Sequence, residues 1–187
     1  LPPGHIAAGY LLAKIVLRHV SFGLTHVQTS TLAWLGAFIA FSPDLDMFFA
    51  FAKARSFSFI KKEVSHRLFP TLHIPLLWLV VAALIYVFTS SPYAHAVALL
   101  LWLCSWSHFV LDSYQYGIMW LWPFSKKLYA VRDVGVKEHI EAHNFFEYWT
   151  RFLNWYANKA KILLYVEVAL IIAFSFSFIQ FGALAGK

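Results

Sequence analysis

The sequence predicts an all-α protein: an integral membrane helical bundle with about four to five transmembrane helices and an interfacial amphipathic helix. Two observations carry this prediction. Of the 187 residues, 60% are hydrophobic and only 13% are charged, whereas about a quarter of the residues of a soluble domain are charged. The apolar residues also gather in long runs, with Lys and Arg beside them, as in multi-pass membrane proteins. We therefore expect a single membrane domain over residues 1–187.

Five apolar runs account for the predicted membrane helices. They are residues 5–22, 28–52, 68–89, 94–113 and 161–182. Lys14 and Arg18 interrupt the first run, which leaves open whether it crosses the membrane or lies at the surface. The last run is long enough to be the final transmembrane helix.

The distribution of cationic residues predicts the orientation of the chain. These residues concentrate in the segments 53–67 and 125–160, whereas the turn 90–93 has no charge. Cytoplasmic loops are enriched in Lys and Arg, so both segments are expected in the cytoplasm and the turn outside. The segment 125–160 is also rich in aromatic residues, which indicates an interfacial helix on the cytoplasmic surface.

The net charge of +6 indicates a partner of opposite charge. Because Lys and Arg lie beside the apolar runs, the expected partner is anionic membrane lipid and not nucleic acid. Cys104 is the only cysteine, so no internal disulfide can form. No Ser/His/Asp or Cys/His triad and no Gly-rich phosphate loop is evident, which argues against a covalent nucleophile. The oligomeric state stays open.

A histidine and an aspartate lie at the end of the fourth apolar run. His108 and Asp112 are four residues apart, which places both side chains on one face of a helix. A carboxylate inside a membrane helix costs roughly 2.5–3.5 kcal/mol, so it is normally retained for function. We expect these two side chains to bind a metal ion.

Two further aspartates interrupt the second run. Ser42 and Pro43 indicate a new helix start, with Asp44 and Asp46 in its first turn. The alternative is that both acids only cap this helix. Capping returns about 1–2 kcal/mol, which is less than the roughly 5–7 kcal/mol that two acids cost at depth. The balance favours a bound cation, with both aspartates as ligands.

The start of the third run supplies further candidates. Pro70 is expected to begin a helix, which leaves His66 in the preceding loop and places His73 one turn into the helix. Both histidines are candidate ligands, and the alternative for His73 is a hydrogen-bonded core histidine. Arg67 is either an interfacial arginine or a clamp for a phosphate oxygen.

A polar stripe in the segment 125–160 includes His143 and Glu147, which are four residues apart. Alone, this stripe would be the solvated face of a surface helix. The predicted topology, however, brings His5 and the aspartates and histidines named above to the same leaflet. We therefore include His5, His143 and Glu147 among the candidate metal ligands.

Several short motifs follow one another in a fixed order. They comprise His5, residues 43–46, His66, Arg67, Thr71, His73, His108, Asp112, Gly117 and residues 122–125. This series, over about residues 1–127, resembles the bacterial YdjM-type family of inner-membrane proteins, described as membrane-bound metal-dependent hydrolases. The family's usual His-Arg-Gly-x-Thr-His-Ser motif is altered, because Leu68 replaces Gly, the second His comes later and Ile74 replaces Ser. The resemblance therefore implies a role for His66 more strongly than for His73.

A more distant likeness is to the zinc-dependent phospholipase C and P1 nuclease group, whose helical His-x3-Asp and His-x3-Glu pairs bind metal. His108 with Asp112 and His143 with Glu147 match those pairs. These resemblances imply phosphoester hydrolysis of a lipid or isoprenoid phosphate at the cytoplasmic leaflet of a bacterial inner membrane. Two or three Zn ions, or Mn or Fe, would activate water, with Arg67 and Asp46 as catalytic residues. The alternatives are a metal-stapled module without activity and an ion or proton transporter.

Overall fold

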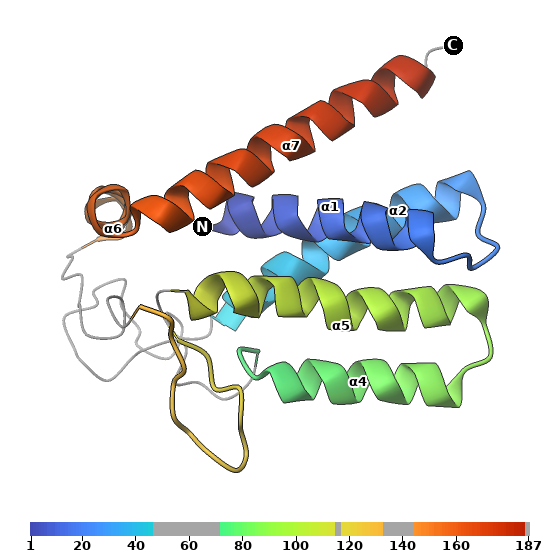
Figure 1. Cartoon of the computed structure of the whole chain (residues 1–187), viewed down its shortest axis with the longest axis horizontal. Helices are drawn as coiled ribbons and strands as arrows, with labels where there is room; N and C mark the ends of the chain where they lie inside the picture. The colour runs from blue at the N-terminus through green and yellow to red at the C-terminus, as the bar shows by residue number, and fades with distance from the viewer. Residues whose placement is uncertain (47–71, 115–116, 133–143, 186–187) are drawn as a thin grey trace. The chain divides into compact units, whose positions relative to one another are not determined.

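The structure is a computed structural model that describes residues 1–46, 72–114, 117–132 and 144–185. Within these ranges the regular structure is helical, as Figure 1 shows. The helices are α1 (Pro2–His19), α2 (His26–Phe41), the 3-10 helix η1 (Ser42–Leu45), α4 (Pro75–Phe88), α5 (Pro92–Ser113), α6 (Phe145–Lys159) and α7 (Lys161–Ala185). The described ranges thus confirm the all-α prediction, and each of the five apolar runs contains a helix.

The chain forms two units. The first contains Leu1–Ser42, Pro75–His108 and Val166–Lys187, and the second contains Pro43–Ile74 and Phe109–Tyr165. The boundary falls inside α5, which is a continuous helix whose last turns carry His108 and Asp112.

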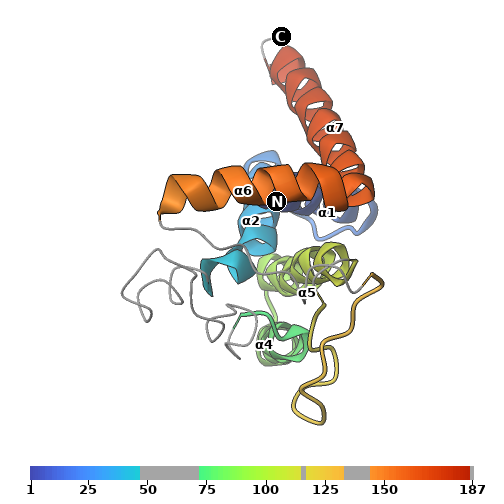
Figure 2. The same cartoon turned by 90° about the vertical axis from the view of Figure 1, so that its left-hand side faces the viewer.

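Helices α1, α2 and α5 form the core of the first unit, and α4 lies beside α5 (Figures 1 and 2). The buried core residues are Ala13, Val16, Leu32, Ile39, Ala40, Ala96, Leu100 and Cys104. Helix α2 begins with a capping box, in which Thr25 and Gln28 satisfy each other's backbone N–H groups. Half of these residues are Ala or Cys, and such small side chains let helices approach one another closely.

Two glycines make the closest approach between α1 and α2. A methyl group added at Gly9 would come within 2.4 Å of the Ala40 Cβ and of the Gly36 carbonyl oxygen. One added at Gly36 would come within 2.5 Å of the Ala13 Cβ. Glycine is therefore required at both positions for the two backbones to pack, as is common in membrane helix pairs.

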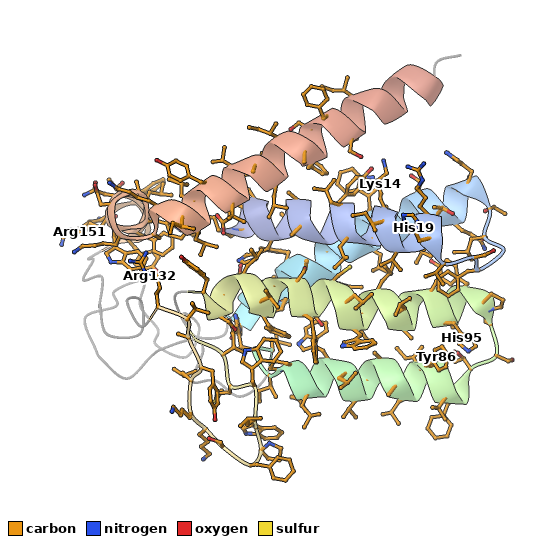
Figure 3. All side chains as sticks on the ribbon, in the orientation of Figure 1. Lys14, His19, Tyr86, His95, Arg132 and Arg151 are labelled. Carbon is orange, nitrogen blue, oxygen red and sulfur yellow. The ribbon has the colours of Figure 1, made fainter. Side chains whose placement is uncertain are left out.

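Helix α7 packs on α1 through aromatic and polar contacts. The Tyr10 ring meets the Phe174 ring edge-on, with 5.0 Å between centroids. The Lys14 ammonium donates to the Ser177 hydroxyl at 2.8 Å, and Figure 3 shows Lys14 on the side of α1 that faces α7. Glu167 is buried and accepts a hydrogen bond from the Leu1 amino group, while Gly4 leaves room for its side chain.

Two helices in the described ranges are long and apolar enough to cross a membrane. They are Pro92–Ser113 and Lys161–Ile179. Helix α4 is also apolar but has only 14 residues. The structure therefore supports membrane-spanning helices, whereas the bundle of about four to five spans remains a prediction. Most of the α7 surface within its apolar window is exposed, as expected of a helix that contacts lipid.

The second unit contains η1, the turn before α4, the end of α5, the segment 117–132 and α6. Helix α6 is capped by the Asn144 side chain, which accepts a hydrogen bond from the Glu147 backbone N–H at 2.9 Å. Its aromatic residues include Tyr148, Trp149, Phe152, Trp155 and Tyr156. Their rings pack on one another, so α6 has the aromatic face expected of an interfacial helix.

Ser42 differs from its expected role. The sequence predicts that its hydroxyl caps a new helix, but the hydroxyl donates to the Ile39 carbonyl oxygen at 2.8 Å. Ser42 therefore closes the end of α2. The chain then continues directly as η1, with Asp44 in its first turn.

Candidate metal site

The last turns of α5 supply a buried histidine in a defined orientation. His108 is fully buried, and its Nδ1 lies 2.8 Å from the Ala40 carbonyl oxygen. A carbonyl oxygen can only accept, so Nδ1 carries the hydrogen. In the neutral ring this leaves the lone pair on Nε2, which is the form in which histidine binds a metal.

His73 has the same tautomer for a different reason. Its Nδ1 lies 2.6 Å from Oδ2 of Asp46, and both side chains are buried. A carboxylate accepts, so Nδ1 again donates and Nε2 is left as the ligand atom. That Nε2 lies 3.8 Å from Oδ2 of Asp112 and 4.0 Å from Oδ1 of Asp44. Carboxylate–histidine pairs of this kind hold metal-binding imidazoles in place.

Four side chains come together around this point. Asp44, His73 and Asp112 belong to the second unit, and His108 lies one turn before Asp112 on α5. One ligand atom from each of the four lies within 4.8 Å of all the others. His73, His108 and Asp112 are buried, and the Asp44 side chain is 17% exposed. Two carboxylates this close repel each other, and the buried Asp112 also loses hydration, so a cation among them would offset both penalties. The group could hold a metal ion.

Local structure explains why His73 reaches this position. The sequence predicts that Pro70 begins the helix and that His73 lies one turn inside it. The structure begins α4 at Pro75, and residues 72–74 form the turn before it. Proline suits the first turn of a helix and disfavours helical backbone in the residue before it. His73 therefore lies at the end of the turn, where it meets Asp46.

Asp46 contacts one of the four grouped side chains but is not itself one of them, in contrast to the prediction. The sequence predicts it as a metal ligand and as a catalytic residue. In the structure its Oδ2 accepts from His73, and Asp46 is not in the group of four. The arrangement makes Asp46 the residue that orients His73.

His5 lies beside the group. It is buried, and its ring lies against the His108 ring, with 4.0 Å between centroids and an angle of 31°. The group of four does not include it.

The remaining predicted residues lie elsewhere. His66, Arg67 and His143 fall outside the described residues. Glu147 is on α6, where its carboxylate pairs with Arg151 at 2.7 Å, and it is not in the group of four. Figure 3 shows Arg151 projecting from α6.

Sequence reasoning misses one participant entirely. The Ala40 carbonyl oxygen fixes the tautomer of His108. No side-chain pattern signals such a role, because every residue has a carbonyl group.

Comparison with known proteins gives a family. The model of the family described as "YdjM inner membrane protein" matches residues 1–184, and the chain therefore belongs to that family. No curated protein and no solved structure matches the chain. The match extends the resemblance noted from the motifs to nearly the full length.

Proposed function

We propose that this member of the YdjM inner membrane protein family is a metal-dependent hydrolase that cleaves a phosphoester of a lipid or isoprenoid phosphate. The observation that carries the proposal is the pair of buried imidazoles, each anchored through Nδ1, beside two carboxylates. The family description itself names no activity. The proposal therefore rests on the chemistry of this group.

The donor set suits a divalent transition metal. Two imidazole nitrogens and two carboxylate oxygens match zinc, and manganese or iron are the alternatives. With both imidazoles neutral, the two carboxylates balance the charge of one divalent ion. His5 lies against His108 and would contribute to a second ion, as the expected two or three ions require.

The residues divide the chemistry among them. A metal bound here would lower the pKa of a coordinated water and stabilise the oxyanions of the phosphoester. His73 and His108 would hold it in a fixed geometry, because Asp46 and the Ala40 carbonyl oxygen lock their rings. Asp44, the most exposed of the four, would lie on the side from which substrate and water enter. Arg67 would bind a phosphate oxygen, as the sequence predicts.

A metal that only staples the helices is the second candidate. It is favoured by the number of protein donors, because four ligands can close a tetrahedral site and leave no position for water. The two candidates differ in what metal removal does. Removal would abolish turnover in the hydrolase, whereas it would lower thermal stability alone in the staple.

Metal analysis of the purified full chain tests the proposal. The variants are His73→Ala and, as a matched control, His95→Ala. His95 lies in the first turn of α5, at the opposite end of the helix from His108 and Asp112, and its Nε2–H donates to the Thr89 carbonyl oxygen at 2.8 Å. Figure 3 shows His95 beside Tyr86, near the turn between α4 and α5. Wild type and His95→Ala should hold stoichiometric metal and hydrolyse phosphatidic acid or an isoprenoid phosphate.

His73→Ala should lose both properties, with at least about a hundredfold lower turnover. Wild type without stoichiometric metal would overturn the proposal. Bound metal with no turnover on either lipid class, and a lower melting temperature after chelation, would establish the staple.

A further inference from the structure

A pocket lies directly after the metal-binding end of α5. It has a volume of about 480 Å³ and is lined by Ser113, Trp120, Lys127, Leu128, Tyr129, Ala130 and Val131. All of these residues belong to the second unit, together with Asp44, His73 and Asp112. The volume is within the range of small-ligand sites, which is about 300–1,000 Å³.

The wall of the pocket is built by the main chain. Ile118 and Tyr129 exchange two backbone hydrogen bonds of 3.1 and 3.0 Å, and the Val131 N–H donates to the Ser113 carbonyl oxygen at 2.8 Å. Gly117 begins the segment at φ +82°, a left-handed conformation that favours glycine. The Trp120 indole N–H donates to the Ser113 hydroxyl at 2.7 Å. The pocket is thus preformed.

The charge of the lining is positive. Among the described residues that line it, Lys127 is the one cation, and none is Asp or Glu. The Lys127 Nζ lies 5.5 Å from the centroid of the Tyr129 ring, so the ammonium is held over another lining residue. An anionic group is the ligand that this lining favours.

The tip of the same segment is apolar and exposed. Leu121 is 52% exposed and Phe124 is 92% exposed, and the exposed Lys126 and Lys127 follow them. Figure 1 shows this segment as a long loop that follows α5. Helix α5 is long and apolar enough to span a bilayer, which would place its end at the membrane interface. Aromatic residues followed by lysines are typical of segments that insert there.

We propose that this pocket binds the head group of an anionic phospholipid, with Lys127 at its phosphate and the tip 121–124 among the acyl chains. The inference rests on the proposed function, whose substrate class it narrows from lipid or isoprenoid phosphates to anionic phospholipids. A chain of aromatic ring contacts runs from the pocket to the candidate metal site. Trp120 lies 6.4 Å from Phe109, and Phe109 lies 6.3 Å from His73, between centroids. The pocket would therefore hold the substrate in the unit that carries the ligands.

Lipid binding to the full chain in detergent tests this inference, with native mass spectrometry as the readout. The probes are phosphatidylglycerol, phosphatidylcholine and inorganic phosphate. Lys127→Gln should weaken phosphatidylglycerol binding about fivefold, because one cation near an anionic head group contributes that much. Lys126→Gln is the matched control, since Lys126 is the adjacent lysine and does not line the pocket. It should bind within about twofold of wild type.

Phe124→Ser separates a lipid from a free anion. The side chain is almost fully exposed, so the variant should fold, and it should weaken phosphatidylglycerol binding about tenfold while leaving inorganic phosphate binding unchanged. Equal binding of phosphatidylcholine and phosphatidylglycerol would overturn the inference. So would wild-type binding by Lys127→Gln, or inorganic phosphate binding as tightly as the lipid.

The metal-site variant His73→Ala distinguishes this inference from the proposed function. It should lose metal and still bind phosphatidylglycerol. If the wild type shows no turnover but prefers phosphatidylglycerol, and Lys127→Gln loses that preference, the pocket is supported and the hydrolase is contradicted. Normal wild-type turnover, together with unchanged phosphatidylglycerol binding by Lys127→Gln, would support the hydrolase and contradict the pocket.

Discussion

The crossing of α1 with α2 and the polar group at the end of α5 are both buried, but they are stabilised by opposite means. At the crossing, Gly9 and Gly36 leave no side chain between the backbones, and the contact is van der Waals packing. In the polar group, side chains fill the space, and hydrogen bonds to Asp46 and to the Ala40 carbonyl oxygen orient the rings of His73 and His108. In a membrane the apolar drive for helix association is weak, so close packing and polar contacts both matter.

Ala40 belongs to both regions. Its Cβ faces Gly9 at the crossing, and its carbonyl oxygen accepts the hydrogen bond from His108. The two regions are therefore stabilised differently but are not independent, because Ala40 takes part in both. Packing sets where the backbone of α2 lies, and that backbone then sets the tautomer of His108, a candidate metal ligand.

The largest expected effect is in the polar group. Asp46→Ala should weaken metal affinity about 10–100-fold, because His73 loses the carboxylate that orients its ring. Competition with a chromophoric chelator measures it. Asp46→Asn keeps an acceptor for Nδ1 and should recover part of the affinity. Equal affinities for wild type and Asp46→Ala would show that His73 needs no such partner.

The crossing should respond to an added methyl group with a loss of stability. Gly9→Ala and Gly36→Ala should each destabilise the folded state by about 1–3 kcal/mol, because the new atom meets backbone or a neighbouring Cβ. Unfolding by sodium dodecyl sulfate in mixed micelles measures this loss. Ile15→Ala, at a half-exposed position on α1, is the control and should change little.

The same two variants sharpen the comparison. Gly9→Ala displaces Ala40 and should also weaken metal binding, whereas Gly36→Ala presses on Ala13 and should leave it unchanged. If both variants bound metal equally well, the Ala40 carbonyl would not couple the two regions.

The smallest expected effect is at the contact between α1 and α7. Ser177→Ala removes the acceptor of the Lys14 ammonium and should destabilise the protein by about 0.6 kcal/mol, the average for such bonds between membrane helices. The same detergent titration measures it, and metal content should stay at the wild-type value. A loss as large as that of Gly9→Ala would place this polar contact on a level with the glycine packing.

The helices and one half of the metal group could be predicted from the sequence. Apolar runs mark the helices because burial in lipid demands them, and the i, i+4 spacing of His108 and Asp112 defines a shared face without any tertiary information. Asp44 also follows from the energetic penalty of a carboxylate at depth. These residues carry their signal locally.

The other half depends on contacts between distant segments. The motif reading places His66 ahead of His73, yet the structure brings His73 into the group and leaves His66 outside the described residues. It also assigns Asp46 to the His73 ring, a pairing across 27 positions of the chain that spacing cannot reveal. The pocket after α5 was invisible for the same reason, since the Ile118–Tyr129 pairing is an isolated bridge within no periodic pattern.

The segment 117–132 after α5 has a base held by its main chain and a tip whose side chains are exposed. Its base is held by main-chain hydrogen bonds at Ile118, Tyr129 and Val131, which do not depend on the identity of the side chains. Its tip, 121–124, exposes the side chains of Leu121 and Phe124. Substitutions at the tip should therefore leave the candidate metal-binding residues undisturbed. If the proposed lipid binding holds, these four positions are the first to vary in order to change which amphiphile is bound.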